Sequence, residues 1–443
     1  MTRKYFGTDG VRGVAGEVLT AELALAIGRA ACEELRSDHT PRVLVIRDTR
    51  ESGEMLEAAL AAGITTAGGD VFTGGVLPTP AAPLLIARYG FDVAVVISAS
   101  HNPYRDNGIK LFGPDGNKLA DDVELAIEAR LAATSHPLPE RMGRVRELHG
   151  THEDYLRELG ERFGGLSLEG VNVLLDCANG ATFRAGPEIF RRLGATVAVI
   201  ADEPDGRNIN DGVGSTHVEA LGAAVVAGGH DLGFAFDGDG DRVLAVDRTG
   251  AVVDGDELIA LAALHLRETG RLPGDGVAVT VMTNYGFHVA MEEAGIEVAT
   301  TNVGDRYVLE ALRERGWALG GEQSGHVIEM GFNATGDGIA SALLTLEALA
   351  GRDLADRGGM RKLPQRLVNV PVADRDAAMQ APDLLAASDD ANAALAGRGR
   401  VLIRASGTEQ LVRVMVEAPT ADEADEVCDR LVAIVRSGAP GSA

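Results

Sequence analysis

Three stretches of the chain repeat one succession of elements: an apolar strand, a turn, and a helix that ends near a glycine. They begin with RVLVIRDTR at 42–50, NVLLDCANGA at 172–181 and GVAVTVMTNYGF at 276–287. Each leads on to a further short strand, DVFTG, TVAVI or EVATT. Because strands alternate with helices in all three stretches, the sequence predicts an α/β fold with three similar domains.

A second strand in each repeat ends in a loop of small and polar residues. The loops are SASHNP after FDVAVVI, DGDGDR after DLGFAF, and GEQSGH after RGWALG. Ligands of open α/β sheets bind where loops leave the carboxyl ends of the strands. We therefore expect the three loops to meet in one cleft.

The C-terminal part of the chain follows a different pattern. It begins with the strand RLVNVPVAD, continues through a helix and two strands, and ends with the helix ADEADEVCDRLVAIVRS. This order predicts a small α+β domain. We place the four domains at residues 1–155, 156–252, 253–364 and 365–443.

The composition excludes several classes of protein. Hydrophobic residues make up 45% of the 443 residues, which is enough for sizeable cores. No apolar run reaches the ~18 residues of a membrane span, and no apolar segment follows the first basic residues, so we expect neither a membrane anchor nor a secretory signal. Cys32, Cys177 and Cys428 lie far apart, as in reduced cytoplasmic proteins. A net charge of −25 disfavours nucleic acid and anionic membrane as partners.

The loop DGDGDR is the sharpest chemical signal. Asp237, Asp239 and Asp241 alternate with glycines, so on an extended segment their carboxylates would point to the same side. Converging carboxylates repel one another unless a cation lies among them, and all-oxygen ligands favour Mg²⁺ over Zn²⁺. Arg242 and Arg248 occupy the positions of the glycine and glutamate that an EF-hand loop needs, which excludes that motif. The remaining alternative is a solvated acidic turn.

Ser100 stands at the end of an apolar strand, in ISASHNPYRDNGIKLF. Two interpretations are open: an ordinary Asn-Pro turn, or a strand end that holds Ser100 as a nucleophile. His101 is a poor general base because adjacent side chains on an extended segment diverge. The chain lacks a G-x-S-x-G motif, so metal-assisted phosphoryl transfer fits better than a hydrolase triad. Lys110, in the next strand, is either a base or a solvated strand residue.

Three further segments place polar side chains beside glycines, and each also has a structural interpretation as a loop, a strand or a terminus. GEQSGH offers a carboxylate and a hydroxyl that suit sugar hydroxyls. RASGTEQLVR brackets a glycine turn with two arginines, which suits a phosphate. KYFGTDGVRG combines an acid and an arginine with three glycines. The candidate residues in these segments are Glu322, Ser324, His326, Arg404, Ser406, Gly407, Thr408, Arg413, Thr8, Asp9 and Arg12.

These motifs together resemble the α-D-phosphohexomutase superfamily over nearly the whole chain. KYFGTDGVRG, ISASHNPYRDNGIK, DGDGDR, GEQSGH and RASGTEQLVR follow one another in family order, and GEQSGH resembles the branch that acts on glucosamine phosphates. The resemblance implies three similar α/β domains with mixed sheets around a central cleft, and a C-terminal α+β domain. Gln410 departs from the family pattern, which has proline there. This change should loosen the turn slightly and leave the phosphate contacts in place.

The resemblance also implies roles for individual residues. Ser100 would carry a phosphoryl group and complete a Mg²⁺ site, and the loop TNVGDRYV at 301–308 would contact the sugar. The implied catalytic residues are Ser100, Lys110, His326 and Arg12; the implied metal ligands are Ser100, Asp237, Asp239 and Asp241; and the implied substrate-binding residues are Thr301, Gly304, Asp305, Glu322, Ser324, Arg404, Ser406, Gly407, Thr408 and Arg413.

The implied reaction interconverts glucosamine 6-phosphate and glucosamine 1-phosphate for UDP-N-acetylglucosamine synthesis. The phosphoserine gives its phosphoryl group to the sugar phosphate, the bisphosphate turns over in the cleft, and the other phosphate returns to the serine. The expected cofactors are Mg²⁺ and, as an activator, glucosamine 1,6-bisphosphate or glucose 1,6-bisphosphate. The expected partner is the phosphosugar itself, and the resemblance allows a homodimer.

Two other functions would use some of these residues. A Mg²⁺-dependent sugar phosphatase would share the metal loop and the serine, but it need not grip a second phosphate. A non-catalytic phosphosugar-binding protein would have no use for Ser100, the three aspartates and Lys110. An assay that separates isomer from free phosphate distinguishes all three functions.

Overall fold

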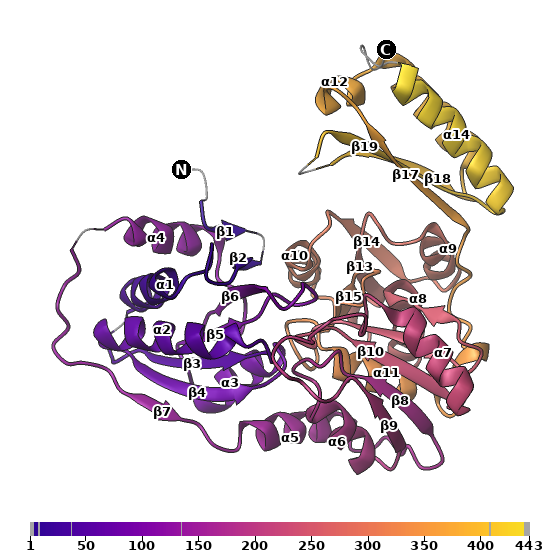
Figure 1. The fold of residues 1–443 in the computed structure, drawn as a ribbon. Coiled ribbons are helices and arrows are strands. Elements are labelled where there is room, and N and C mark those ends of the chain that lie inside the picture. Colours follow the sequence, from indigo (N-terminus) through magenta and orange to yellow (C-terminus); the bar gives the residue numbers. More distant parts are fainter. Residues whose placement is uncertain (1–3, 8, 37, 134, 407–408, 438–443) are drawn as a thin grey trace. The chain divides into compact units, whose positions relative to one another are not determined.

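The chain folds into two compact units (Figure 1). The larger comprises Met1–Val281 with Ala299–Arg357, and the smaller comprises Met282–Val298 with Gly358–Ala443. The structure, a computed structural model, describes residues 4–7, 9–36, 38–133, 135–406 and 409–437. Within these residues, no helix is long and apolar enough to cross a membrane.

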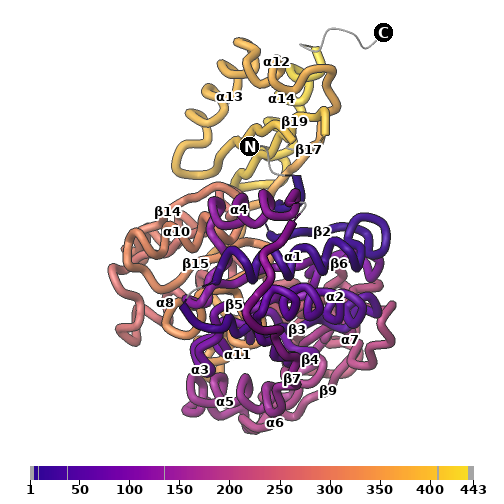
Figure 2. The backbone as a smooth tube through the Cα atoms, turned by 90° about the vertical axis from the view of Figure 1, so that its left-hand side faces the viewer, coloured from indigo at the N-terminus to yellow at the C-terminus, as the bar shows by residue number. Residues whose placement is uncertain are grey.

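The first sheet of the larger unit is formed by the N-terminal third of the chain. Its strands are β1 (Phe6–Gly7), β2 (Gly10–Val14), β3 (Arg42–Arg47), β4 (Asp70–Val76), β5 (Val93–Ile97), β6 (Asp106–Phe112) and β7 (Val145–Glu147), and its helices are α1 (Ala21–Glu34), α2 (Ser52–Thr66), α3 (Ala81–Tyr89) and α4 (Asp121–Leu131). Alternate residues of the strands share one core with α1, α2 and α4, which Figure 2 shows beside the sheet. All five residues of β5 are buried, as expected for a central strand that is covered on both faces.

The second sheet follows along the chain. Its strands are β8 (Asn172–Asp176), β9 (Thr196–Ile200), β10 (Leu232–Phe236), β11 (Val243–Asp247) and β12 (Val252–Val253), and its helices are α5 (Thr151–Phe163), α6 (Ala185–Arg192) and α7 (Val218–Gly228). Like β5, β10 is buried at all five residues. The sequence therefore places an apolar strand directly before each of the first two functional loops.

The third sheet has four strands. They are β13 (Gly276–Thr280), β14 (Glu297–Thr301), β15 (Leu319–Gly321) and β16 (Val327–Glu329), and the helical segments are α8 (Gly255–Glu268), η1 (Pro273–Asp275), α10 (Asp305–Arg315), α11 (Gly338–Leu349) and η2 (Leu354–Asp356). Helix α11 is apolar nearly all round and is buried along most of its length. It packs against α8 of its own domain and β11 of the second sheet, which ties the two domains together.

The three sheets contain one common strand order. It reads β6-β5-β3-β4 in the first, β11-β10-β8-β9 in the second and β16-β15-β13-β14 in the third. In each sheet the outer strand of this series runs antiparallel to its neighbour, whereas that neighbour runs parallel to the next strand. This confirms three similar α/β domains with mixed sheets. The loops with Ser100, the aspartates and Glu322 all connect the same two strands of the repeat.

The smaller unit contains the predicted α+β domain. Its elements are α9 (Tyr285–Glu293), β17 (Gln365–Pro371), α12 (Arg375–Met379), α13 (Pro382–Leu395), β18 (Arg400–Ala405), β19 (Leu411–Glu417) and α14 (Ala421–Ser437). The sheet is antiparallel throughout, with the order β17-β19-β18, and α13 and α14 share its core. The buried Glu417 accepts hydrogen bonds from the backbone nitrogen of Tyr285 and from Asn284, so α9 is anchored to this sheet.

Candidate active site

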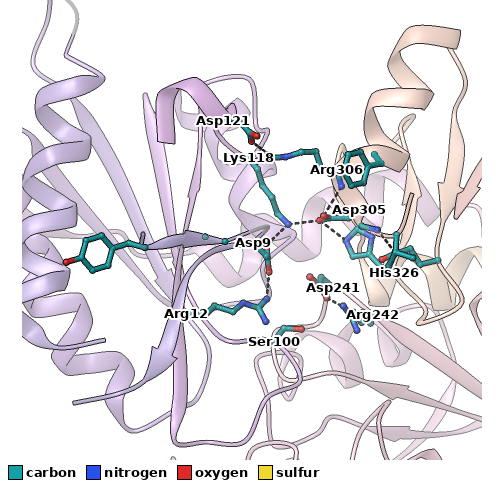
Figure 3. A pocket seen from close by; sticks show the side chains of 17 residues that line it. Asp9, Arg12, Ser100, Lys118, Asp121, Asp241, Arg242, Asp305, Arg306 and His326 are labelled. Atoms are coloured by element: carbon teal, nitrogen blue, oxygen red, sulfur yellow. Dashed lines mark hydrogen bonds and ion pairs between the residues drawn. The ribbon is translucent and has the colours of Figure 1, made fainter. Parts of the chain in front are cut away.

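A cavity of about 500 Å³ in the larger unit is lined by residues from all three α/β domains (Figure 3). Four cationic side chains and five carboxylates contribute to it. The lining therefore has no surplus of positive charge that could hold a phosphosugar by itself. The lining residues are Tyr5, Gly7, Asp9, Gly10, Arg12, Ser100, Lys118, Asp121, Asp241, Arg242, Val303, Gly304, Asp305, Arg306, Tyr307, Glu322 and His326.

The carboxylates of Asp237, Asp239 and Asp241 are buried, and one oxygen of each lies within 4.8 Å of the other two. The alternating aspartates and glycines predicted an extended segment here, but the loop is a turn, with Gly240 at φ +72°. Glycine is favoured at 240 by this left-handed conformation. At 238, a Cβ would lie 2.6 Å from the carbonyl oxygen of Ser100. The alternating glycines therefore serve close packing and a tight turn.

The surroundings of the carboxylates shift the pKa values of Asp237 and Asp239 in opposite directions. Burial raises the pKa of Asp237 well above its ordinary value, and Asp241 and Asp239 raise it further. Burial would raise the pKa of Asp239 too, but Lys110 outweighs this effect and the pKa is lowered. Lys110 Nζ donates to Asp239 at 2.8 Å and lies 3.2 Å from Asp9. Although burial opposes it, these carboxylates raise the pKa of Lys110, which is therefore protonated at neutral pH.

Ser100 lies in the turn between β5 and β6 and is 1% exposed. Its Oγ donates to Asp237 at 2.6 Å and lies 3.3 Å from Nδ1 of His101. The backbone of Ser100 is left-handed, with φ +52°. Such a conformation is uncommon for a residue with a side chain and costs roughly 1–3 kcal/mol. The fold therefore holds this serine in a strained conformation beside the three aspartates.

The third loop contributes two side chains to the cavity. Glu322 accepts a hydrogen bond at 3.0 Å from the backbone nitrogen of Gly304, the N-cap residue of α10. His326 is 3% exposed, and its Nε2 accepts from the backbone nitrogen of Gly336 at 3.2 Å. The neutral ring then carries its proton on Nδ1, which has no hydrogen-bond partner among the described residues.

Two residues that the resemblance assigns to the sugar are not among the cavity-lining residues. Thr301 ends β14, and its hydroxyl donates to backbone carbonyl groups of Val279 and Asn302. The Oγ of Ser324 is buried, and no described residue accepts or donates a hydrogen bond to it. Asp305 does line the cavity, where it pairs with Lys118.

Sequence reasoning missed several charged residues of the cavity. Lys118 forms ion pairs with Asp9 and with Asp305, 187 residues further along the chain. Arg306 pairs with Asp121 and the backbone nitrogen of Arg242 donates to Asp237. The predicted Arg12 pairs with Asp9, as Figure 3 shows. No motif marks Lys118, because its partners are brought to it only by the tertiary fold.

The C-terminal candidates belong to the smaller unit. Arg404 and Arg413 are directly opposite each other on β18 and β19, so two like charges are neighbours on one face of the sheet. Ser406 is buried, and its carbonyl group accepts a hydrogen bond from Arg375, which the sequence analysis did not single out. Gly407 and Thr408, like Thr8 in the N-terminal motif, lie outside the described residues.

Comparison with known families covers almost the whole chain. Models of the phosphoglucomutase/phosphomannomutase family match residues 3–137 (alpha/beta/alpha domain I), 153–250 (domain II), 254–365 (domain III) and 367–434 (C-terminal domain). Among solved structures, a phosphoglucomutase/phosphomannomutase family protein from Burkholderia thailandensis is similar with a TM-score of 0.83 and 25% identity, covering 99% of this chain and 98% of that one.

Curated relatives share about half of their residues with the chain. The phosphoglucosamine mutase of Moorella thermoacetica is 52% identical over 433 residues, 96% of this chain and 97% of its own length. That of Mycolicibacterium paratuberculosis is 50% identical over 439 residues, with 98% and 99% coverage. A fungal N-acetylphosphoglucosamine mutase from Aspergillus fumigatus, solved with GlcNAc-6P and magnesium, has the same fold with a TM-score of 0.67, 19% identity, and 99% and 96% coverage.

Similarity at this level over the full length establishes both the fold and the class of reaction. The family isomerises sugar phosphates by way of a phosphoserine and a bisphosphate. The chain therefore belongs to the phosphoglucosamine mutases of the phosphoglucomutase/phosphomannomutase family.

Proposed function

We propose that Ser100 is the residue through which this isomerase moves the phosphoryl group between the 6- and 1-positions of glucosamine phosphate. The observation that carries the proposal is the 2.6 Å hydrogen bond from Ser100 Oγ to Asp237, one of three clustered carboxylates. Ser100 is buried beside three buried carboxylates and has a strained backbone, and Asp239 and Asp241 raise the pKa of Asp237. Such an arrangement is costly for stability, which favours a role in catalysis.

The donor set fits a magnesium ion. Three carboxylates and a serine oxygen are hard ligands, and Oδ1 of Asp239 and of Asp241 is buried without a hydrogen-bond partner among the described residues. Asp237, Asp239, Asp241 and phosphorylated Ser100 would hold the ion. When bound, Mg²⁺ neutralises charge on the transferred phosphoryl group. It also compensates for the cavity lining, which has more carboxylates than cations.

Protonated Lys110 is suited to supply positive charge to the transferring phosphoryl group, because three carboxylates keep it charged beside the aspartate cluster. The same raised pKa makes it a weak proton donor. His326 lines the cavity, with Nε2 3.9 Å from Asp305, so its imidazole is suited to contact the bound sugar. Arg12 and Arg242 supply positive charge at the cavity wall, and Glu322 suits the hydroxyls of the sugar ring. A bisphosphate that turns over between the two transfers would act as both intermediate and activator.

Several finer assignments are part of this proposal. The fourth domain would hold the phosphate that is not reacting, and the product would enter UDP-N-acetylglucosamine synthesis. A cytoplasmic location agrees with three free and buried cysteines. The domain limits 1–155, 156–252, 253–364 and 365–443 stay a proposal, and the first of them falls within α5. A homodimer is part of the proposal, and a measurement of molecular mass in solution tests it.

The proposal is tested by assaying purified protein with glucosamine 6-phosphate, Mg²⁺ and a trace of glucose 1,6-bisphosphate. Intact-mass and peptide analysis should find phosphate on Ser100, and Ser100→Ala should lose nearly all isomerisation. Asp239→Asn should weaken Mg²⁺ binding, measured by calorimetry, together with turnover, whereas Asp383→Asn on the exposed face of α13 should change neither. Full activity of the protein in EDTA, or no phosphoserine after incubation with the bisphosphate, would show that these residues have another role.

A further inference from the structure

Arg50 is one of the largest fully buried side chains in the larger unit, and all five of its N–H groups have a partner. Its Nε donates to Asp48 at 2.8 Å. Its two terminal nitrogens donate to four backbone carbonyl groups, three in the turn between β5 and β6 and one at the first residue of β6. These carbonyl groups belong to Ser100, Asn102, Pro103 and Asp106. Every N–H group of the Arg50 side chain therefore donates either to the segment that contains Ser100 or to the buried Asp48.

The same acid also holds the other side of Ser100. Ser98 Oγ donates to Asp48 at 2.6 Å and accepts from the backbone nitrogen of Ser100 at 3.0 Å. Hydrogen bonds thus fix both backbone groups of Ser100. Its N–H is held by Ser98, its carbonyl group is held by Arg50, and Asp48 accepts from both Ser98 and Arg50. A residue with φ +52° needs such a frame, because an unconstrained serine would relax to a right-handed or extended conformation.

A second domain completes the frame. Asn210, between β9 and α7, donates to the carbonyl groups of Ser100 and Asn102, at 2.9 and 3.1 Å. Arg50 donates to the same two carbonyl groups from the first domain. Gly238 of the aspartate loop packs against the Ser100 carbonyl so closely that a Cβ would lie 2.6 Å from its oxygen. The position of Ser100 relative to the three aspartates is therefore set at this carbonyl group.

We propose that Arg50 is a positioning residue for phosphoryl transfer, which aims Ser100 Oγ at the aspartates by fixing the backbone of its loop. The inference rests on the proposed role of Ser100. Lysine cannot replace arginine here, because a single ammonium has three donors at one point and cannot span four carbonyl groups and a carboxylate. The loop has no helix or strand of its own between β5 and β6, so the Ser100 and Asn102 carbonyl groups depend on side-chain donors, which are Arg50 and Asn210 among the described residues.

The test compares Arg50→Lys with Arg42→Lys. Arg42 begins β3 and also donates to two carbonyl groups, those of Tyr89 and Gly90, but at the far end of the strand. Each protein is phosphorylated with glucose 1,6-bisphosphate, and phosphoserine is counted by mass spectrometry. Transfer to glucosamine 6-phosphate is then followed in a single turnover, beside the slow release of inorganic phosphate without sugar. Per phosphoserine, Arg50→Lys should transfer ~100-fold more slowly, since small misplacements of reacting groups have effects of this size.

Phosphate release to water should change far less, because water can approach a misplaced phosphoserine as easily as a well-placed one. The ratio of hydrolysis to transfer should therefore rise, whereas a mere loss of folded protein lowers both rates equally. Arg42→Lys should leave the ratio unchanged. Ser98→Ala removes only the hydrogen bond to the Ser100 nitrogen and should raise the ratio of hydrolysis to transfer by ~10-fold. This variant tests the proposal if Arg50→Lys does not fold.

An unchanged ratio in the folded variant, with wild-type transfer, would overturn the role of Arg50. Wild-type protein that never acquires phosphate on Ser100 would instead overturn the proposed function. The two failures are therefore distinguishable.

Discussion

Asp337 shows how a single residue outside the cavity responds to burial. It is the N-cap residue of helix α11, and it accepts hydrogen bonds from the backbone nitrogen of Ala340 and from the hydroxyl of Tyr155 on α5. Burial raises the pKa of Asp337 to about 7, although both hydrogen bonds oppose the shift. The carboxyl group is therefore neutral in mildly acidic solution and becomes a buried charge above neutral pH.

We expect this carboxyl to make stability depend on pH. A folded pKa above the unfolded value means that the contribution to stability is complete below the unfolded pKa of about 4 and is lost as pH rises through about 7. Asp337→Asn keeps a cap acceptor but cannot ionise. Between pH 5 and pH 7, the free energy of unfolding of wild type, measured in urea, should fall relative to that of Asp337→Asn. The difference between the two proteins should change by up to about 1.4 kcal/mol per pH unit.

The same change at the exposed cap of α12, Asp374→Asn, provides the control. Its difference from wild type should stay constant over this range. If Asp337→Asn also shows a constant difference, Asp337 is ionised throughout and its burial is compensated in another way.

At the scale of residues, sequence reasoning found the groups whose chemistry is written in a local motif. Ser100 and the three aspartates could be recognised because a strand end and an acidic repeat mark them. Lys118 and Arg50 could not, since each depends on groups far away: Lys118 on Asp305, and Arg50 on carbonyl groups some fifty residues further along. A lysine in a turn or an arginine after a strand has no local sign of such contacts.

At the scale of elements, the pairing of β18 with β19 brings together two residues that the sequence predicts to bind phosphate. Arg404 and Arg413 are cross-strand partners, and like charges directly opposite each other destabilise a sheet. The sequence predicted both strands, but not their register, which makes the two arginines neighbours. An anion held between the two guanidinium groups would remove the repulsion.

We therefore expect Arg404→Ala and Arg413→Ala each to lower kcat/KM by roughly ten- to a hundredfold, the loss of one charged hydrogen bond to phosphate. Neither should destabilise the protein without substrate, because each relieves a like-charge contact. Steady-state kinetics and thermal melting measure the two effects. Arg366→Ala, on β17 of the same sheet, is the matched control and should leave kinetics unchanged. Wild-type kcat/KM in both variants would remove the fourth domain from phosphate binding.

The aspartate loop shows where element-level reasoning failed. An extended segment was expected to bring the three carboxylates together, and they are together, but a turn does it. The turn depends on Gly238 and Gly240, which the sequence alone indicates only as small residues between the aspartates. Close packing on Ser100 and a left-handed backbone give them their function, and both require knowledge of the neighbouring loop.

For the whole molecule, repetition in the sequence predicted three similar domains, and the common strand order confirms them. The order within each sheet was beyond reach, because apolar strands look alike whichever neighbour they have. The grouping of α9 with the C-terminal sheet was also not predictable. It depends on Glu417, which lies 132 residues beyond the nitrogen that it accepts from.

The charge of the cavity lining has a consequence for how fast substrate arrives. Four cations are balanced by five carboxylates there, and the chain as a whole has a net charge of −25. A sugar phosphate dianion is therefore repelled over long range by the net charge of the chain, and the cavity lining does not offset this repulsion. Adding salt shortens the Debye length from ~30 Å at 0.01 M to ~8 Å at 0.15 M, which screens the outer repulsion and leaves the enclosed contacts almost untouched.

With Mg²⁺ held constant, kcat/KM should rise over this range of NaCl while kcat stays level, as stopped-flow and steady-state assays can measure. A fall in kcat/KM would mean that local cations steer the substrate despite the acidic surface. If the rise is found, assays in dilute buffer underestimate the kcat/KM of this enzyme, because its own net charge slows the arrival of substrate.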